Sequence, residues 1–186
     1  MKMLFAAAGI AVISCGALLT TGSPAAEPFS PYVDEKGNIS LPKDFHSWQF
    51  LGTWGVATDE DNEVGSKGFH NVYTKPETVL AFRKTGKFPD GAVLVKELLK
   101  AKTDSMTTGE ISYPTETDGW FIMIKDAKGR FKDNKLWGDG WGWALFKAKN
   151  PTKTVTEDYK DDCLSCHVPA KQDDWIYLRG YPGLKK

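Results

Sequence analysis

The amino-acid sequence predicts an α+β fold that is mainly an antiparallel β-sheet, with one mid-chain helix and a helical segment at the C-terminal end. Short runs of aromatic and β-branched residues recur along the chain, and turns rich in Gly, Pro and Asp separate them. One stretch near the middle carries the start and stop signals of a helix, and the residues after Pro151 have helical character. This mixture is typical of an α+β domain rather than of an all-helical protein.

About six short strands are expected, because six runs are dominated by apolar, aromatic or β-branched residues. They are residues 48–56, 69–74, 92–99, 107–113, 120–124 and 141–146. A short extended piece at residues 38–41 precedes them and ends at Pro42. A turn that contains Pro and Asp separates the fourth expected strand from the fifth, and a polar loop at residues 126–140 precedes the sixth.

The mid-chain helix is expected to begin at a capping box, Thr74-Lys75-Pro76-Glu77, with Pro in the first turn. Val79 and Phe82 stand three residues apart on its buried stripe, and Gly86 ends it. Towards the C-terminus we expect one helix from Thr156 and a second, amphipathic helix near residues 173–178.

Residues 1–26 have the layout of an export signal. Lys2 is their only charged residue, an apolar run spans residues 3–19, and small residues follow at 23–26. We therefore expect cleavage after this segment and a periplasmic protein. Two alternatives remain: the apolar run is just long enough to be a membrane span, and Cys15 ends a sequence that resembles a lipoprotein box, so it could carry a lipid anchor.

Residues 27–186 are long enough for one domain with one core. Without Lys2 the chain has 23 basic residues against 24 acidic ones, so its net charge is about −1. This balance gives no reason to expect nucleic acid or an anionic membrane as a partner.

The C-terminal part contains Cys163-Leu164-Ser165-Cys166-His167, the spacing that attaches a c-type haem. Each thiol adds to one vinyl group, and the imidazole that follows the second thiol binds the iron. A helical turn beginning near Asp161 would place Cys163 and Cys166 on one face, because residues three apart are neighbours there. The motif predicts one covalently bound haem c, with His167 as the proximal iron ligand.

Other interpretations of the two thiols have less support. A zinc site would need a second ligand pair, which the sequence lacks. A redox-active pair would need an electropositive setting, whereas the residues before Cys163 are rich in acids that raise thiol pKa values. Those acids are Glu157, Asp158, Asp161 and Asp162. Removal of Cys15 with the signal would leave no cysteines for a structural disulfide.

Several short motifs, in their order along the chain, resemble the cytochrome P460 family, which includes cytochrome c′-β. They are Leu41-Pro42-Lys43, Val72-Tyr73, Pro76-Glu77, Lys84-Thr85-Gly86-Lys87-Phe88, Asp90-Gly91, Val95-Lys96-Glu97-Leu98, Ile124-Lys125-Asp126, the haem motif and Asp174-Trp175. The resemblance implies a mainly antiparallel β fold, usually homodimeric, with one five-coordinate haem and an open distal side.

The family has two branches with different chemistry. One oxidises hydroxylamine, using a lysine bonded to the haem edge and a distal carboxylate that moves protons. The other has an apolar distal pocket capped by phenylalanine and binds nitric oxide. The resemblance places Lys96 at the cross-linking position and Phe121 at the position of the carboxylate. The alternatives are that Lys96 is a solvated residue of an edge strand and that Phe121 belongs to the ordinary core.

Met123 is a candidate sixth ligand, because on a strand it shares a face with Phe121. A six-coordinate iron would favour electron transfer over gas binding, although a methionine that fills the core is also consistent with the pattern. His46 and His70 are further candidates for the sixth position, with a surface or core role as the alternative. Met106, in a polar turn, is a poor candidate.

These observations predict an exported mono-haem cytochrome with a mostly apolar distal side, whose main expected ligand is nitric oxide or another small nitrogen oxide. Hydroxylamine oxidation through a Lys96-linked haem and electron transfer through a Met123-ligated haem are the alternatives. A redox partner protein is compatible with all three.

Overall fold

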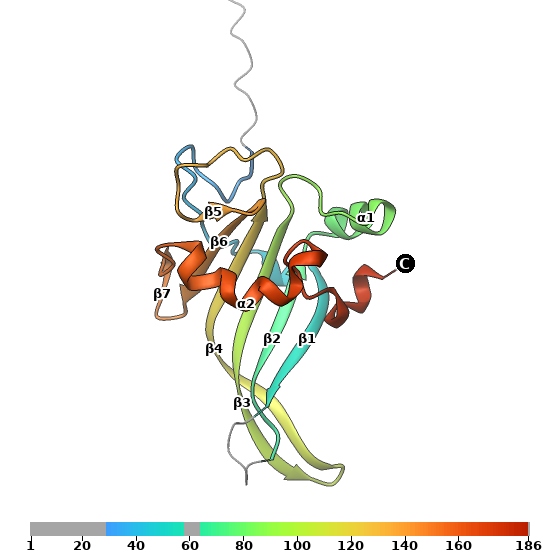
Figure 1. Cartoon of the computed structure of the whole chain (residues 1–186). Coiled ribbons are helices and arrows are strands. Elements are labelled where there is room, and N and C mark those ends of the chain that lie inside the picture. Colours follow the sequence, from blue (N-terminus) through green and yellow to red (C-terminus); the bar gives the residue numbers. More distant parts are fainter. Residues whose placement is uncertain (1–28, 58–63, 186) are drawn as a thin grey trace, which may run out of the picture.

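The computed structural model describes residues 29–57 and 64–185, which form a seven-stranded sheet with two α-helices (Figure 1). The strands are β1 (Gln49–Ala57), β2 (Ser66–Thr74), β3 (Val93–Met106), β4 (Gly109–Lys125), β5 (Trp137–Gly138), β6 (Trp141–Lys147) and β7 (Asn150–Thr154). All pairings are antiparallel in the order β1-β2-β3-β4-β6-β5, and β7 pairs with β6. The predicted α+β class is confirmed.

The β3–β4 hairpin is the longest element and extends beyond the rest of the sheet (Figure 1). We expected two strands where β4 forms one, and that prediction was wrong. The register between β3 and β4 shifts on both sides of Leu99. The residues opposite it, from Pro114 to Asp118, therefore form irregularities within β4 and do not end the strand. Pro114, which has no N–H to donate, lies where the register shifts.

Helix α1 (Pro76–Thr85) follows β2 and ends as expected, with Gly86 in the left-handed conformation at φ 74°. Its start differs from the predicted capping box. Lys75 occupies the N-cap position with no side-chain hydrogen bond, because the Thr74 hydroxyl instead donates to the Val93 carbonyl oxygen at 2.6 Å. The buried hydroxyl therefore links β2 to β3 rather than capping the helix.

The C-terminal segment, residues 156–185, crosses one face of the sheet (Figure 1). It contains a π-helical turn (Lys160–Leu164), α2 (Ser165–His167) and three 3₁₀ turns at Val168–Asp173, Leu178–Gly180 and Pro182–Leu184. The predicted helix thus begins later than Thr156. The helix expected near residues 173–178 is absent, because Asp174 and Trp175 both have positive φ angles. Strand β7 was also missed by the sequence analysis.

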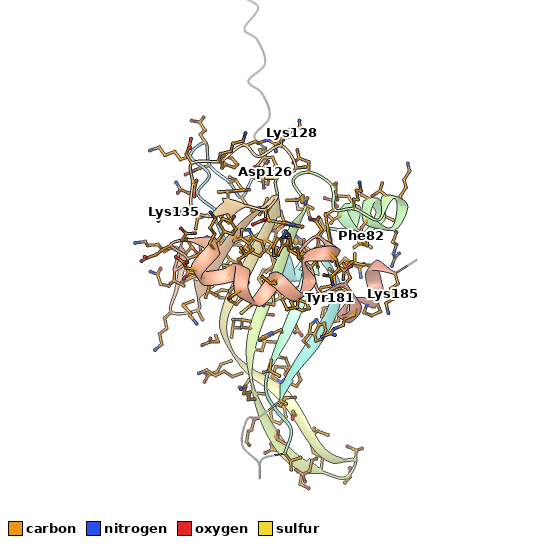
Figure 2. The ribbon with its side chains drawn as sticks, viewed as in Figure 1. Phe82, Asp126, Lys128, Lys135, Tyr181 and Lys185 are labelled. Carbon is orange, nitrogen blue, oxygen red and sulfur yellow. The ribbon has the colours of Figure 1, made fainter. Side chains whose placement is uncertain are left out.

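The sheet has hydrophobic clusters on both faces, as the alternation of strand side chains requires. One cluster packs beneath the C-terminal segment and includes Leu94 and Trp143 from the sheet. Phe82 from α1 and Tyr181 from the C-terminal segment lie over this same face (Figure 2). The cluster on the opposite face contains Val95 and Ile122 and is covered by the N-terminal residues and the loop after β4.

The predicted export signal and Cys15 lie outside the described residues. Within the described ranges, no helix has the length and apolar character needed to span a membrane.

Candidate functional site

A cavity of about 550 Å³ lies between the sheet and the C-terminal segment. This volume is in the usual range for cofactor and small-molecule sites, about 300–1,000 Å³. Its sheet wall includes Trp54, His70, Val72, Leu94, Lys96, Phe121, Met123 and Trp143. Its other wall includes Asp162, Cys163, Cys166, His167, Ile176, Tyr177, Arg179 and Tyr181. A separate cavity of about 390 Å³ lies along residues 126–141, away from the cysteines and histidines, so it is not the candidate site.

The close approach of the two walls depends on glycine. A Cβ atom at Gly52 in β1 would collide with the backbone oxygen of Gly180, and one at Gly180 would collide with the Trp54 indole. These contacts allow the C-terminal segment to close over the edge of the sheet beside the cavity.

The motif residues Cys163, Cys166 and His167 all line the cavity. Cys163 is buried and Cys166 is exposed, and both are free thiols. Burial raises the pKa of Cys163 to about 11. Among residues 29–57 and 64–185, no group of three or more His, Cys, Asp or Glu side chains could hold a metal ion. The described residues therefore do not complete the alternative zinc site.

His167 is held in one tautomer by the backbone. Its Nδ1 lies 2.7 Å from the Trp175 carbonyl oxygen, which can only accept, so Nδ1 carries the proton and Nε2 has a free lone pair. Burial lowers the pKa of His167, which favours the neutral ring. The imidazole packs edge-on against Trp143, with ring centroids 5.0 Å apart. A neutral imidazole with Nε2 available is the form that ligates haem iron.

Lys96 lies on β3, which is an interior strand of the sheet, and not on an edge strand. Its Nζ is 4.4 Å from the centre of the Phe121 ring, and the two residues are directly paired across β3 and β4. Burial lowers the pKa of Lys96. Among the described residues, no carboxylate lies within ion-pair distance of this amine.

His70 also lines the cavity, on β2, whereas His46 does not. Burial, with a smaller contribution from the Lys96 charge, lowers the pKa of His70 to about 4. No described side chain or backbone group forms a hydrogen bond with its ring. His46 lies at the opposite face, where its Nε2 is 3.2 Å from Glu97 Oε1, so it is remote from the candidate iron position. Met106 lies at the exposed tip of the β3–β4 hairpin.

Several cavity residues were missed by the sequence analysis: Trp54, Trp143, Tyr177 and Arg179. The guanidinium of Arg179 lies 5.3 Å from the Trp54 ring, and the Tyr177 hydroxyl donates to the Cys166 carbonyl oxygen. Asp162 is a carboxylate at the cavity, but it comes from the motif side, where Oδ2 accepts from the backbone N–H groups of Glu157 and Asp158. Only the proximity of Tyr177 and Arg179 to the haem motif in sequence could have indicated their role.

These features define the class of c-type haem proteins. A largely apolar cavity fits a haem when one wall carries two thiols and an imidazole whose Nε2 is free to bind iron. A model of the cytochrome P460 family matches residues 42–178, which is most of the chain. The protein belongs to this family. Its members are haem c proteins, and the family is associated with the oxidation of hydroxylamine. A comparison with curated proteins found no match.

Proposed function

We propose that this protein is an exported cytochrome that binds nitric oxide at the iron of one haem. Cys163 and Cys166 would attach the haem, and His167 would be its proximal ligand. The observation that carries the proposal is the placement of all three residues on one cavity wall, with Phe121 on the wall that faces them. Haem, when bound, would supply an iron that can bind a small ligand and that has two accessible oxidation states.

The chain's own residues favour a small neutral ligand. Phe121, Met123, Val72 and Leu94 make much of the sheet wall apolar, which disfavours water and suits a neutral diatomic ligand. The carboxylate that would move protons in a hydroxylamine oxidase has no counterpart on this wall among the described residues. A positioned general base contributes about 10²–10⁴-fold in rate, and this wall lacks the carboxylate that would supply it.

Hydroxylamine oxidation is the second candidate, because Lys96 is at the cavity. Its lowered pKa increases the fraction of neutral amine, which is the nucleophilic form. Electron transfer is the third candidate, because Met123 and His70 both line the cavity and either could occupy the sixth position.

The absorption spectrum of the reduced protein, with and without carbon monoxide or nitric oxide, distinguishes gas binding from electron transfer. A five-coordinate iron should bind either gas at once. An iron that resists both gases in the parent, and binds them after Met123→Leu or His70→Leu, would support the electron-transfer candidate instead.

His167 and Phe121 are tested by substitution. His167→Ala should leave haem attached but alter its spectrum, and His46→Ala at the opposite face is the matched control. Phe121→Ala should speed ligand entry, and Phe121→Glu should raise any hydroxylamine oxidation above background. An unaltered spectrum in His167→Ala, or ligand rates equal to the parent in both Phe121 variants, would show that these roles are assigned incorrectly.

Denaturing electrophoresis with haem staining tests the Lys96 bond. We expect a Cys163→Ala/Cys166→Ala variant to lose its haem on denaturation. Haem that stays with this chain, and is lost only after the further change Lys96→Ala, would make hydroxylamine oxidation the better assignment.

The family resemblance also supports a homodimer, and the sequence of residues 1–26 supports a periplasmic location. Light scattering of the purified protein and fractionation of expressing cells test these two proposals. A monomer would contradict the first proposal, and a protein found in the cytoplasmic fraction would contradict the second.

A further inference from the structure

We propose that Lys125 and Asp174 form a tether that positions His167 on the iron. Both are positioning residues, because they act through the backbone at Trp175 and do not themselves reach the cavity. The inference rests on the proximal-ligand role proposed above for His167.

The tether is an ion pair between the sheet and the C-terminal segment. Lys125 is the last residue of β4, and its Nζ lies 2.7 Å from Asp174 Oδ1. The same oxygen accepts from Trp141 Nε1 at 3.2 Å, and Lys125 Nζ lies 4.8 Å from the centre of the Trp141 ring. The side chains of Lys125 and Asp174 are 13% and 37% exposed, against 59% and 73% for the Lys100–Glu116 pair. Solvent therefore screens this pair less than it screens the exposed pairs of the molecule.

The tether holds a backbone that would not otherwise adopt its conformation. Asp174 has φ 57° and ψ 38°, and Trp175 has φ 67°. A non-glycine residue in this region costs about 1–2 kcal/mol, so two in succession need support from their surroundings. The ion pair fixes the first residue, and the burial of the indole, 7% exposed, fixes the second.

This conformation aims the Trp175 carbonyl at the proximal imidazole. The carbonyl oxygen accepts from His167 Nδ1 at 2.7 Å. The Trp175 indole also packs edge-on against Trp143, which itself packs against His167. An acceptor on Nδ1 raises the basicity of Nε2 and fixes the ring orientation. A more basic ligand stabilises ferric over ferrous iron.

The described residues give this ion pair a distinct position. It joins the sheet to the chain after the haem motif, whereas the other described ion pairs lie upstream of that region. Two short motifs far apart in the sequence, Ile124-Lys125-Asp126 and Asp174-Trp175, thus meet at one contact.

Loss of the tether should let the left-handed pair relax and withdraw the carbonyl from Nδ1. We expect the preference for ferric iron to fall about tenfold, which corresponds to a rise in reduction potential of about 59 mV for one electron. The stretching frequency of the iron–histidine bond in the ferrous protein should fall with it.

The experiment measures both quantities in the haem-loaded protein. Lys125→Met removes the cation, and Asp174→Asn removes the anion while it keeps an acceptor for Trp141 and a residue that tolerates positive φ. Lys125→Arg retains the pair. Lys100→Met breaks the Lys100–Glu116 pair, 3.1 Å long and exposed on the hairpin, as the matched control.

The tether is supported if Lys125→Met and Asp174→Asn raise the potential equally, their combination raises it no further, and Lys125→Arg and Lys100→Met match the parent. It is overturned if Lys125→Met lowers the melting temperature but leaves both the reduction potential and the iron–histidine stretching frequency unchanged. Failure of the proximal-ligand role proposed for His167 gives a different result. In that case His167→Ala itself would leave the haem spectrum unaltered.

Discussion

Lys96 and Glu97 are neighbours on β3, yet their side chains lie on opposite faces of the sheet and in opposite chemical situations. Glu97 is buried and satisfied, with His46 Nε2 at 3.2 Å and the Thr117 hydroxyl at 3.4 Å. Lys96 faces the cavity, and its described contact is the Phe121 ring. A buried charge with partners maintains the structure, whereas a charge left without a counterion at a cavity is available to a ligand.

The same contrast extends along the strands. On the face opposite the cavity, Val95, Ile122 and Phe146 are at most 1% exposed and fill the core. On the cavity face the alternate residues leave space for a cofactor. The period of two along each strand therefore builds a packed layer and a binding layer from one set of strands.

The first prediction compares adjacent residues of β4 on the two faces. Ile122→Ala should destabilise the protein by about 3 kcal/mol, because it opens a cavity in the packed layer. Met123→Ala should cost less, about 2 kcal/mol, because its side chain already borders the cavity. Denaturant unfolding of each variant gives the free energies. Equal losses would show that the binding layer is as tightly packed as the core, and a changed haem spectrum in Met123→Ala would show that this residue ligates the iron.

The second prediction concerns His70 in the binding layer. Its pKa is about 4 in the folded protein and 6.5 in the unfolded chain, so the unfolded state binds more protons between these values. Stability should therefore fall as the pH drops from 6.5 to 4. After discounting for partial exposure, we expect this residue to account for about 1–2 kcal/mol of that loss. His70→Gln should flatten the decline by this amount, and an identical pH profile would place the imidazole in open solvent.

The third and smallest effect is expected at Lys96. Its folded pKa lies below 10.5, so the unfolded chain binds more protons and the charged amine costs stability at neutral pH. Lys96→Met should stabilise the protein by about 0.5–1 kcal/mol at pH 7, in the range of ordinary single substitutions. The advantage should disappear as the pH rises through 10.5. Destabilisation by this change would indicate that the amine is bonded to the haem.

Much of the sheet was predictable because local patterns and tertiary structure agree in it. Strands β1, β2 and β6 lie within a few residues of their predicted positions, and Gly86 ends α1 as expected. The errors arose where long-range pairing outweighs local signals. Pro114 and Asp118 look like a turn, but pairing with β3 carries the strand through them, and Thr74 caps no helix because its hydroxyl is used by Val93.

The relative positions of the candidate site's residues were predictable only where covalent chemistry fixes the spacing, although Lys96, Phe121, Met123 and His70 were each named as candidates and line the cavity. Cys163, Cys166 and His167 follow from one motif, whereas His70 and Lys96 reach the cavity through strand register. The paired position of His70 is Leu98, two residues from Lys96, and nothing in the local sequence reports that relation. The carbonyl of Trp175 was also beyond sequence analysis, because it depends on two left-handed residues.

The burial of Cys163 has a consequence for the order of folding. Strands β3 and β4 are joined by a short turn, so their hairpin can form early, whereas the contacts of the C-terminal segment join distant residues, such as Arg83 and Gly183. The segment should therefore dock late. Until it docks, the thiol has an ordinary pKa, and afterwards its pKa is about 11 and the reactive thiolate is scarce. The thioether proposed at Cys163 would therefore form more readily before the C-terminal segment docks than after it.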